Sequence, residues 1–275
     1  MQSWDSRVVK IAQSYREKPL LIAELRINPI RVQSFGDYHR ENALAEIPDA
    51  EVLNLHYYKS AAEKVAKGSP PRQRMKRVVR EIMILQTSLP EGIFVRHGGS
   101  RPDVLKVLII GPQGTPYEDG FFLFDMFLPL DFPQKPPSLR LRTATPHTSF
   151  FSGFSGFNPN LYVDGHREPW RPEQSTLLQV LVSVQAMILC PNPYYNEPHR
   201  TQNDAESAKY NKKVREMTVD AAIIPWVRAT AREHGGHVSR AAAATGSTTS
   251  QSNFSPLWKD VAVKYFVKDS KYRKH

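Results

Sequence analysis

Cysteine is almost absent from this chain, whose 275 residues include only Cys190. A single cysteine excludes an internal disulfide, and free thiols are typical of reducing compartments, which favours a cytosolic or nuclear protein. Cys190 follows a predicted buried helix that ends near Leu189. The carboxyl end of a helix disfavours a thiolate, and free cysteines are among the most buried residues. We therefore do not expect Cys190 to act as a nucleophile.

Long hydrophobic runs are also missing. No segment approaches the roughly 18 apolar residues that a membrane-spanning helix needs. Trp4, Asp5 and Arg7 interrupt the stretch where a secretory signal would be apolar. The nine histidines show no zinc-binding spacing, and no glycine-rich phosphate loop or nucleophile elbow occurs. We therefore expect no membrane span, no metal and no cofactor.

Negative charge is scarce, because 27 Asp and Glu stand against 37 Lys and Arg and the net charge is +10. This excess raises the alternative of a nucleic-acid-binding protein. The basic residues are dispersed, however, apart from clusters at 72–80 and 268–275, and no zinc-finger or RNA-binding motif accompanies them. A solvated basic face explains the charge better, so we expect no nucleic acid as a partner.

Turn and linker residues divide the chain into four parts. Apolar residues at helical spacing within 4–15 and 52–66 predict a helical amino-terminal extension of unknown role over residues 1–70. A core domain is expected over 71–235. The small polar residues of 236–255 predict a flexible linker. Residues 256–275 predict a basic amphipathic helix that packs back on the core or, alternatively, lies on a membrane surface.

The core pattern predicts an α+β domain. A helix is expected from about Arg72 to Thr87, with an apolar stripe formed by Met75, Val78, Val79, Ile82 and Met83. Four apolar runs bounded by Gly and Pro predict an antiparallel meander with strands at 93–96, 104–110, 121–128 and 139–141. A capping box, Thr176 to Gln179, predicts the start of a buried helix. A last helical stretch, 203–232, should break at Pro225.

Several short motifs follow one another through this core. Gly114-Thr-Pro-Tyr-Glu-Asp-Gly120 precedes the third apolar run, and Asp131-Phe-Pro-Gln-Lys-Pro-Pro137 follows it. Downstream come Phe157-Asn-Pro-Asn-Leu-Tyr-Val-Asp-Gly165, Trp170-Arg-Pro172 and Pro191-Asn-Pro-Tyr-Tyr-Asn-Glu-Pro198. Asn-Pro-Asn and Asp-Gly are turn signals, so the third motif alone would predict only an ordered surface loop.

In this fixed order the motifs resemble the ubiquitin-conjugating (UBC) core from about Arg72 to Trp226. The resemblance is strongest to a large subgroup that includes the giant inhibitor-of-apoptosis conjugating enzyme and the plant phosphate-homeostasis conjugating enzyme. It implies a UBC-like fold with an amino-terminal helix, a four-stranded antiparallel meander, a buried central helix and carboxy-terminal helices. It also implies three partners: ubiquitin, the ubiquitin-activating enzyme and a RING-type or related ubiquitin ligase.

The catalytic cysteine of this family is missing here. Conjugation passes ubiquitin through a thioester, which needs a thiolate and a donor for the developing oxyanion. The resemblance gives Asn160 the oxyanion or loop-holding role, but the cysteine position falls on Glu168. A carboxylate cannot replace the thiolate, because the resulting anhydride would hydrolyse. Asn160 and Trp170 are also only ten residues apart, fewer than in the family, which indicates a deleted segment.

The resemblance further implies binding surfaces that do not need the cysteine. In the family, the basic face of the first helix docks on the activating enzyme, and ligases contact that helix and two proline-containing loops. On this chain these surfaces comprise Arg74, Lys76, Arg77, Phe132, Pro133, Pro136, Pro191 and Asn192. The alternative is that the prolines only turn the chain.

Two functions follow from these observations. The first is a non-catalytic ubiquitin-conjugating-enzyme-like protein that binds ubiquitin, a conjugating enzyme or a ligase. The second is an active thioester transferase of which this chain is an incomplete splice or gene-model version.

Overall fold

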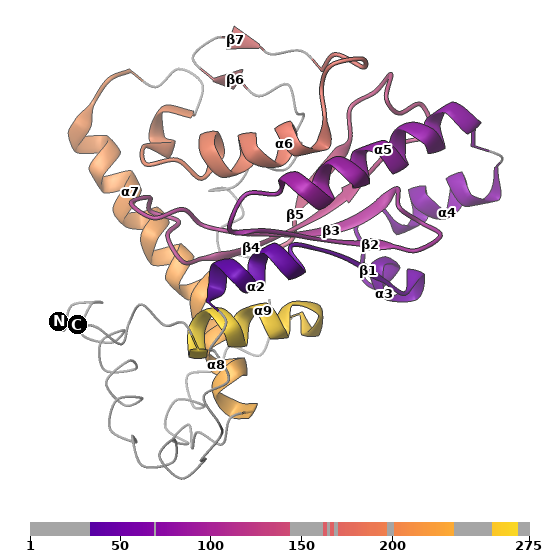
Figure 1. Cartoon of the computed structure of the whole chain (residues 1–275). Coiled ribbons are helices and arrows are strands. Elements are labelled where there is room, and N and C mark those ends of the chain that lie inside the picture. Colours follow the sequence, from indigo (N-terminus) through magenta and orange to yellow (C-terminus); the bar gives the residue numbers. More distant parts are fainter. Residues whose placement is uncertain are drawn as a thin grey trace.

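The computed structural model describes residues 34–68, 70–143, 162–163, 166–167, 170–196, 201–233 and 255–268. A sheet forms the middle of the molecule, and helices cover both of its faces (Figure 1). The α+β fold predicted from the sequence is therefore confirmed. The predicted 1–70, 71–235, 236–255 and 256–275 boundaries stay predictions.

The sheet has five strands in the order of the chain: β1 (Leu44–Ile47), β2 (Ile93–Gly98), β3 (Val104–Ile110), β4 (Phe121–Phe127) and β5 (Ser138–Leu141). The last four form the predicted antiparallel meander. β1 was not predicted, and it lies parallel to β2 at the edge of the sheet. The amino-terminal extension is therefore not purely helical, because it contributes this edge strand.

The first face of the sheet packs against α5 (Arg72–Ser88) and α6 (Leu177–Ser183), which lie above it in Figure 1. Alternate strand residues meet them in one apolar cluster, since successive side chains of a strand point to opposite faces. The fully buried members include Val78, Leu85, Val95, Val107 and Leu181. Burying one such side chain stabilises the fold by about 1.5–3 kcal/mol.

α6 begins as the sequence predicts. The Thr176 hydroxyl accepts a hydrogen bond from the Gln179 backbone N–H, and the Gln179 side chain accepts one from the Thr176 N–H. This reciprocal cap satisfies two backbone donors that a helix start leaves without partners. The helix continues into a π-helical segment, Val184–Ile188. Its burial is incomplete, because Val182 and Met187 are more than a third exposed.

On the second face, an aromatic cluster lies between the sheet and three helices, α2 (Phe35–Asn42), α8 (Ile224–Glu233) and α9 (Lys259–Val263). Trp258, immediately before α9, is 1% exposed and lies under the Arg96 guanidinium at 4.9 Å. Tyr265 donates a hydrogen bond to Asp119 at 2.5 Å. Residues 255–268 thus pack back on the core.

The helical stretch continues through Pro225 instead of breaking there as predicted, and its hydrogen bonding changes just before the proline. α7 (Asp204–Thr218) begins where Asn203 accepts a hydrogen bond from the Glu206 N–H. A π-helical segment, Val219–Ile223, then precedes α8, which contains Pro225 near its start. Proline has no N–H for the helical ladder and its ring crowds the preceding turn, so the helix changes its hydrogen bonding there.

The predicted helix over 52–66 is two helices, α3 (Asp49–Leu53) and α4 (Lys59–Lys67). Leu55 between them has φ +53°, which no helix continues through. Val52 and Ala62 are fully buried against Val104 and Phe127 of the sheet. The earlier helical pattern, over 4–15, lies outside the described residues.

Candidate functional site

The segment that would carry the conjugation chemistry is described only in part. Asn160 and Glu168 lie outside the described residues, as does the Asp164-Gly165 turn pair. Two short strands lie between Asn160 and Glu168 in the sequence, β6 (Tyr162–Val163) and β7 (His166–Arg167), and they pair antiparallel with each other. The roles that the family resemblance gives Asn160 and Glu168 therefore stay predictions.

The chain directly after this segment is held firmly. The Trp170 indole N–H donates to the Pro133 carbonyl at 2.6 Å, and its ring lies 5.9 Å from that of Phe132. Arg77 of α5 donates to the carbonyls of Pro172 and Ser175, at 2.5 and 2.7 Å. The chain from Trp170 to Ser175 thus keeps a fixed place on the core.

Glu81 is a positioning residue that sequence reasoning missed. Its side chain is fully buried, accepts from Arg77 Nε at 2.6 Å, and accepts from the Leu177 N–H at 2.8 Å. One carboxylate therefore joins α5 to the start of α6. The spacing of Arg77 and Glu81, four residues apart on one helix, is the signal that could have identified the pair.

Phe132 is not an exposed anchor for a ligase, so this prediction is wrong. Its side chain is 2% exposed and belongs to the main apolar cluster. The Arg77 guanidinium lies 5.9 Å from the centre of its ring. The loop exposes other residues, since Pro133 and Pro136 are half-buried and Gln134 is open to solvent.

Arg74 is likewise not available to a partner. It is 3% exposed, pairs with the buried Asp103 at 2.9 Å, and donates to the carbonyls of Leu128 and Pro129. Arg77 is mostly occupied by the contacts described above. Of the three predicted docking cations, only Lys76 is exposed.

The exposed side of α5 differs from the predicted apolar stripe. Val79 and Met83 are 49% and 63% exposed, whereas Val78, Glu81 and Leu85 face the core. The exposed face of α5 thus combines two apolar residues with three cations and comprises Arg72, Lys76, Val79, Arg80 and Met83. Apolar contact area beside positive charge suits a protein partner with an acidic rim.

The loop after α6 presents Pro191 and Asn192 to solvent, as a partner-binding role requires. Cys190 next to them is half-buried, and its Sγ accepts from Asn196 Nδ2 at 3.5 Å. Cys190 comes two residues after the π-helical segment Val184–Ile188 that continues α6.

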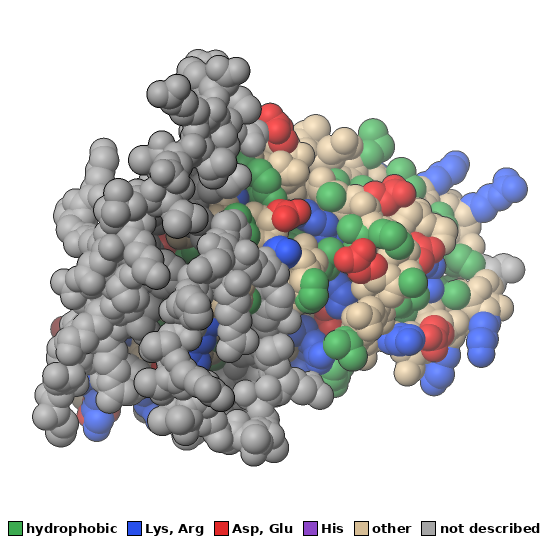
Figure 2. Space-filling view, turned by 90° about the horizontal axis from the view of Figure 1, so that it is seen from below, with side chains coloured by type: hydrophobic (Ala, Val, Ile, Leu, Met, Phe, Trp, Pro, Cys, Tyr) green, Lys and Arg blue, Asp and Glu red, His purple; other side chains and the backbone are tan. Residues whose placement is uncertain are grey.

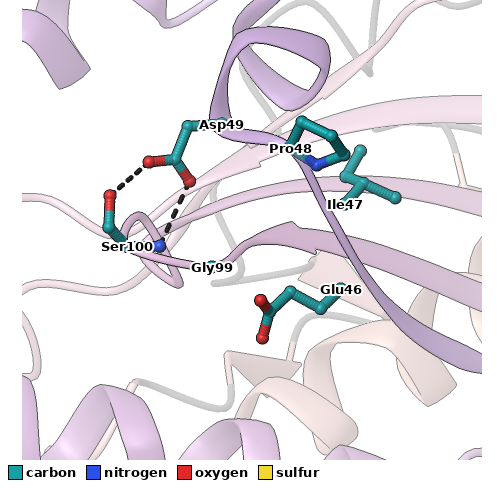
Figure 3. Close-up of a pocket in the computed structure, with 6 residues that line it drawn as sticks. All are labelled: Glu46, Ile47, Pro48, Asp49, Gly99 and Ser100. Atoms are coloured by element: carbon teal, nitrogen blue, oxygen red, sulfur yellow. Dashed lines mark hydrogen bonds between the residues drawn. The ribbon is translucent and has the colours of Figure 1, made fainter.

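A shallow concavity of about 430 Å³ opens where β1 and β2 end together (Figure 3). Asp49 there accepts hydrogen bonds from the backbone N–H and the hydroxyl of Ser100. Glu46 is the second carboxylate of the lining. Within the described ranges no group of three or more metal-ligating side chains occurs. Nor is any helix in these ranges long and apolar enough to cross a membrane.

Comparison with known proteins supplies the family. Residues 77–218, more than half of the chain, match the model of the family described as "Ubiquitin-conjugating enzyme". The chain is 37% identical over 199 residues to the human "Dual E2 ubiquitin-conjugating enzyme/E3 ubiquitin-protein ligase BIRC6". It is 40% identical over 187 residues to "Probable ubiquitin-conjugating enzyme E2 25" of Arabidopsis thaliana. It is 36% identical over 192 residues to "Probable ubiquitin-conjugating enzyme protein 17" of Caenorhabditis elegans.

These matches cover 64%, 61% and 61% of this chain, but only 4%, 28% and 25% of the three relatives. The chain therefore spans less than a third of each of them. The matched region contains α5 from Arg77 onward, the meander, α6 and α7, which are the elements that the resemblance implied. On sequence and fold together, the chain belongs to the ubiquitin-conjugating enzyme family.

Proposed function

We propose that this chain is a non-catalytic member of its family, a binding module of the ubiquitin pathway that works in the cytosol or nucleus. The observation that carries the proposal is the single cysteine, Cys190, which follows the π-helical segment Val184–Ile188 that continues α6 and is hydrogen-bonded to Asn196. A thioester needs an accessible thiolate. Cys190 is half-buried and follows the carboxyl end of a helix, whereas reactive cysteines typically lie at a helix amino terminus or beside a cation.

The surfaces for binding are present although the thiolate is not. The exposed face of α5 offers Lys76 and Arg80 beside Val79 and Met83, and Pro191 and Asn192 are exposed on the loop after α6. These surfaces support the activating enzyme and a ligase as direct partners. Ubiquitin would be a partner through its attachment to those two proteins. Charge complementarity would mainly raise the association rate, whereas the apolar contacts would slow dissociation.

The test of catalysis is direct. The purified chain is incubated with ubiquitin-activating enzyme, ATP and ubiquitin, beside a cysteine-containing conjugating enzyme as a positive control for the reagents. We expect no adduct that a thiol reductant removes. A robust adduct that disappears in Cys190→Ser would overturn the proposal.

The test of binding uses surface variants of the same chain. Affinity for the activating enzyme should fall at least fivefold in the double variant Lys76→Glu, Met83→Ala. Lys212→Glu, an exposed position on α7, serves as the matched charge control and should bind as the parent does. Equal affinity of all three proteins would remove the exposed face of α5 from the proposal.

A second candidate is an active conjugating enzyme of which this sequence lacks an internal segment. Nine residues separate Asn160 from Trp170, yet the chain after them has a fixed place, because Trp170 and Arg77 hold it on the core. Sequencing the transcript across the codons for Gly165 to Trp170 decides between the two. An inserted segment that encodes a cysteine supports the enzyme, and an uninterrupted exon identical to this sequence excludes it.

A further inference from the structure

The second face of the sheet carries a row of charged residues between its apolar ends. Arg96, Lys106, Asp125 and Arg140 are register partners across β2, β3, β4 and β5, so they lie side by side on one face. The aromatic cluster under α9 covers one end of this face, and the cluster of Val52 and Ala62 covers the other. Figure 2 shows the molecule from this side, and its described part carries apolar, basic and acidic side chains intermixed.

Asp125 is the only carboxylate of the row and is shared by several donors. It is 2% exposed and receives Lys106 Nζ at 3.4 Å, Arg142 Nε at 3.2 Å and the Tyr57 backbone N–H at 2.7 Å. Lys106 and Arg142 thus share one carboxylate. The two cations outnumber this anion, and the Arg142 side chain is 39% exposed.

A turn between α3 and α4 lies over this charged row, and we call it the Leu55 knuckle (Asn54 to Tyr58). His56 anchors it, since the buried ring accepts from the Tyr58 N–H through Nδ1 and lies 3.1 Å from the Leu105 carbonyl through Nε2. Tyr57 is bound to Asp125 through its backbone. Arg142 Nη2 donates to the Leu55 carbonyl at 3.3 Å. The knuckle is therefore held by contacts with Leu105 of β3, Asp125 of β4 and Arg142, which directly follows β5.

The knuckle presents apolar side chains to solvent instead of burying them. Leu55 is 79% exposed and Tyr57 is 52% exposed, the first with a left-handed backbone at φ +53°. The Arg140 guanidinium lies over the Tyr57 ring at 4.9 Å. A left-handed backbone is sterically unfavourable for a residue with a large side chain. Such backbone strain persists only where the surrounding structure enforces it, and strained residues are found most often at functional sites. Glycine would meet the backbone requirement at no such cost.

We propose that the Leu55 knuckle, with Arg140 and Arg142, is a docking surface for a protein segment in which an apolar side chain is flanked by carboxylates. Leu55 and Tyr57 supply the apolar contact, and the two arginines supply bidentate donors for the carboxylates. The surface lies outside the exposed face of α5 and the loop after α6, and it does not depend on the proposed function.

Charge complementarity and exposure select this occupant. The excess of cations over the single carboxylate, Asp125, favours an anion. A nucleic acid would use the cations but would leave Leu55 without an apolar partner. An apolar segment without carboxylates would add no anion beside Lys106 and Arg142, which share the single carboxylate of Asp125. Only a segment with both features uses the whole surface.

The experiment measures fluorescence anisotropy of labelled twelve-residue peptides titrated with the full chain. One peptide carries Leu and Phe between Asp and Glu residues. The second replaces the acids by Lys, and the third replaces Leu and Phe by Ser. We expect the first peptide to bind at least tenfold tighter than either control, with an affinity that falls as salt rises.

Leu55→Gly is the decisive variant, because it removes the side chain and also relieves the left-handed strain. We expect it to weaken the first peptide at least fivefold while its unfolding midpoint equals or exceeds that of the parent. Leu130→Ala, at a leucine that is 50% exposed, serves as the matched control and should bind normally. Equal binding of the three peptides, or full binding by Leu55→Gly, would overturn the proposal. The proposal would also be overturned if a DNA duplex of random sequence bound the chain, and if this binding required Arg142 but not Leu55.

Discussion

The fully buried carboxylate of Glu81 on α5 accepts a hydrogen bond from the backbone N–H of Leu177 at the start of α6, over 2.8 Å. The same carboxylate pairs with Arg77, which in turn holds the carbonyls of Pro172 and Ser175. Helix α5 and the chain from Pro172 to Leu177 are thus joined through one anion. A negative charge at a helix start is also favoured by the helix dipole.

Glu81→Ala should therefore lower the free energy of unfolding by about 3 kcal/mol, since it leaves Arg77 and the Leu177 N–H without their buried partner. Urea denaturation followed by circular dichroism measures the change. Glu63→Ala, an exposed position on α4, is the control and should change stability by no more than about 0.5 kcal/mol. A loss below about 1 kcal/mol in Glu81→Ala would contradict the positioning role.

Phe132→Ala should destabilise the fold rather than affect a partner. The ring is 2% exposed between Trp170 and Arg77, and removing a buried phenylalanine costs about 3–5 kcal/mol. Guanidinium denaturation of the variant, beside Leu130→Ala from the same loop, measures the difference. If Phe132→Ala kept the stability of the parent, the ring would not be part of the core.

The sequence predicted the meander and the α6 cap because these features are local. Runs bounded by Gly and Pro place the strands, and Thr176 and Gln179 lie within one turn of each other. Burial was harder to predict from the sequence. Arg74, for example, is buried against Asp103 and against the Leu128 carbonyl, which lies more than fifty residues further along the chain. Val79 and Met83 have helical spacing, but the spacing does not say which side of α5 the sheet covers. β1 was missed because four residues form a strand only beside β2.

The candidate site was predicted unevenly for the same reason. Lys76, Pro191 and Asn192 are exposed as a partner surface requires, whereas Phe132 and Arg74 are packed inside. The Leu55 knuckle could not have been anticipated, because its anchors come from three strands or their ends. Its backbone conformation carries no sequence signal, since leucine is an unusual residue for φ above zero.

His56 should make stability depend on pH. Burial lowers its pKa below the ordinary 6.5, and Lys106 and Arg142 act in the same direction, while Asp125 and the Leu105 carbonyl oppose them. The unfolded chain then binds a proton on His56 near pH 6.5, whereas the folded chain binds it only at lower pH. The free energy of unfolding therefore falls as pH drops through this window and levels off below the folded-state pKa.

The measurement compares the parent with His56→Gln, which keeps a polar side chain but cannot titrate. Unfolding midpoints are taken at steps between about pH 8 and pH 5. The variant is less stable at high pH, because the pair of contacts to Leu105 and Tyr58 is disturbed, but its stability should decline less steeply towards acid. Parallel curves for the two proteins would exclude His56 as the source of the dependence.

Trp258→Ala should show whether the carboxy-terminal segment belongs to the folded domain. Trp258 is 1% exposed beneath Arg96, and Val261 and Ala262 are buried beside it. Loss of the indole removes a large apolar contact and should lower the free energy of unfolding by about 3–5 kcal/mol. Denaturant titration of the full chain measures this, with the exposed Lys212→Ala as control. If Trp258→Ala left stability unchanged, the segment would not contribute to the core, and α9 would have to be regarded as a separate surface helix.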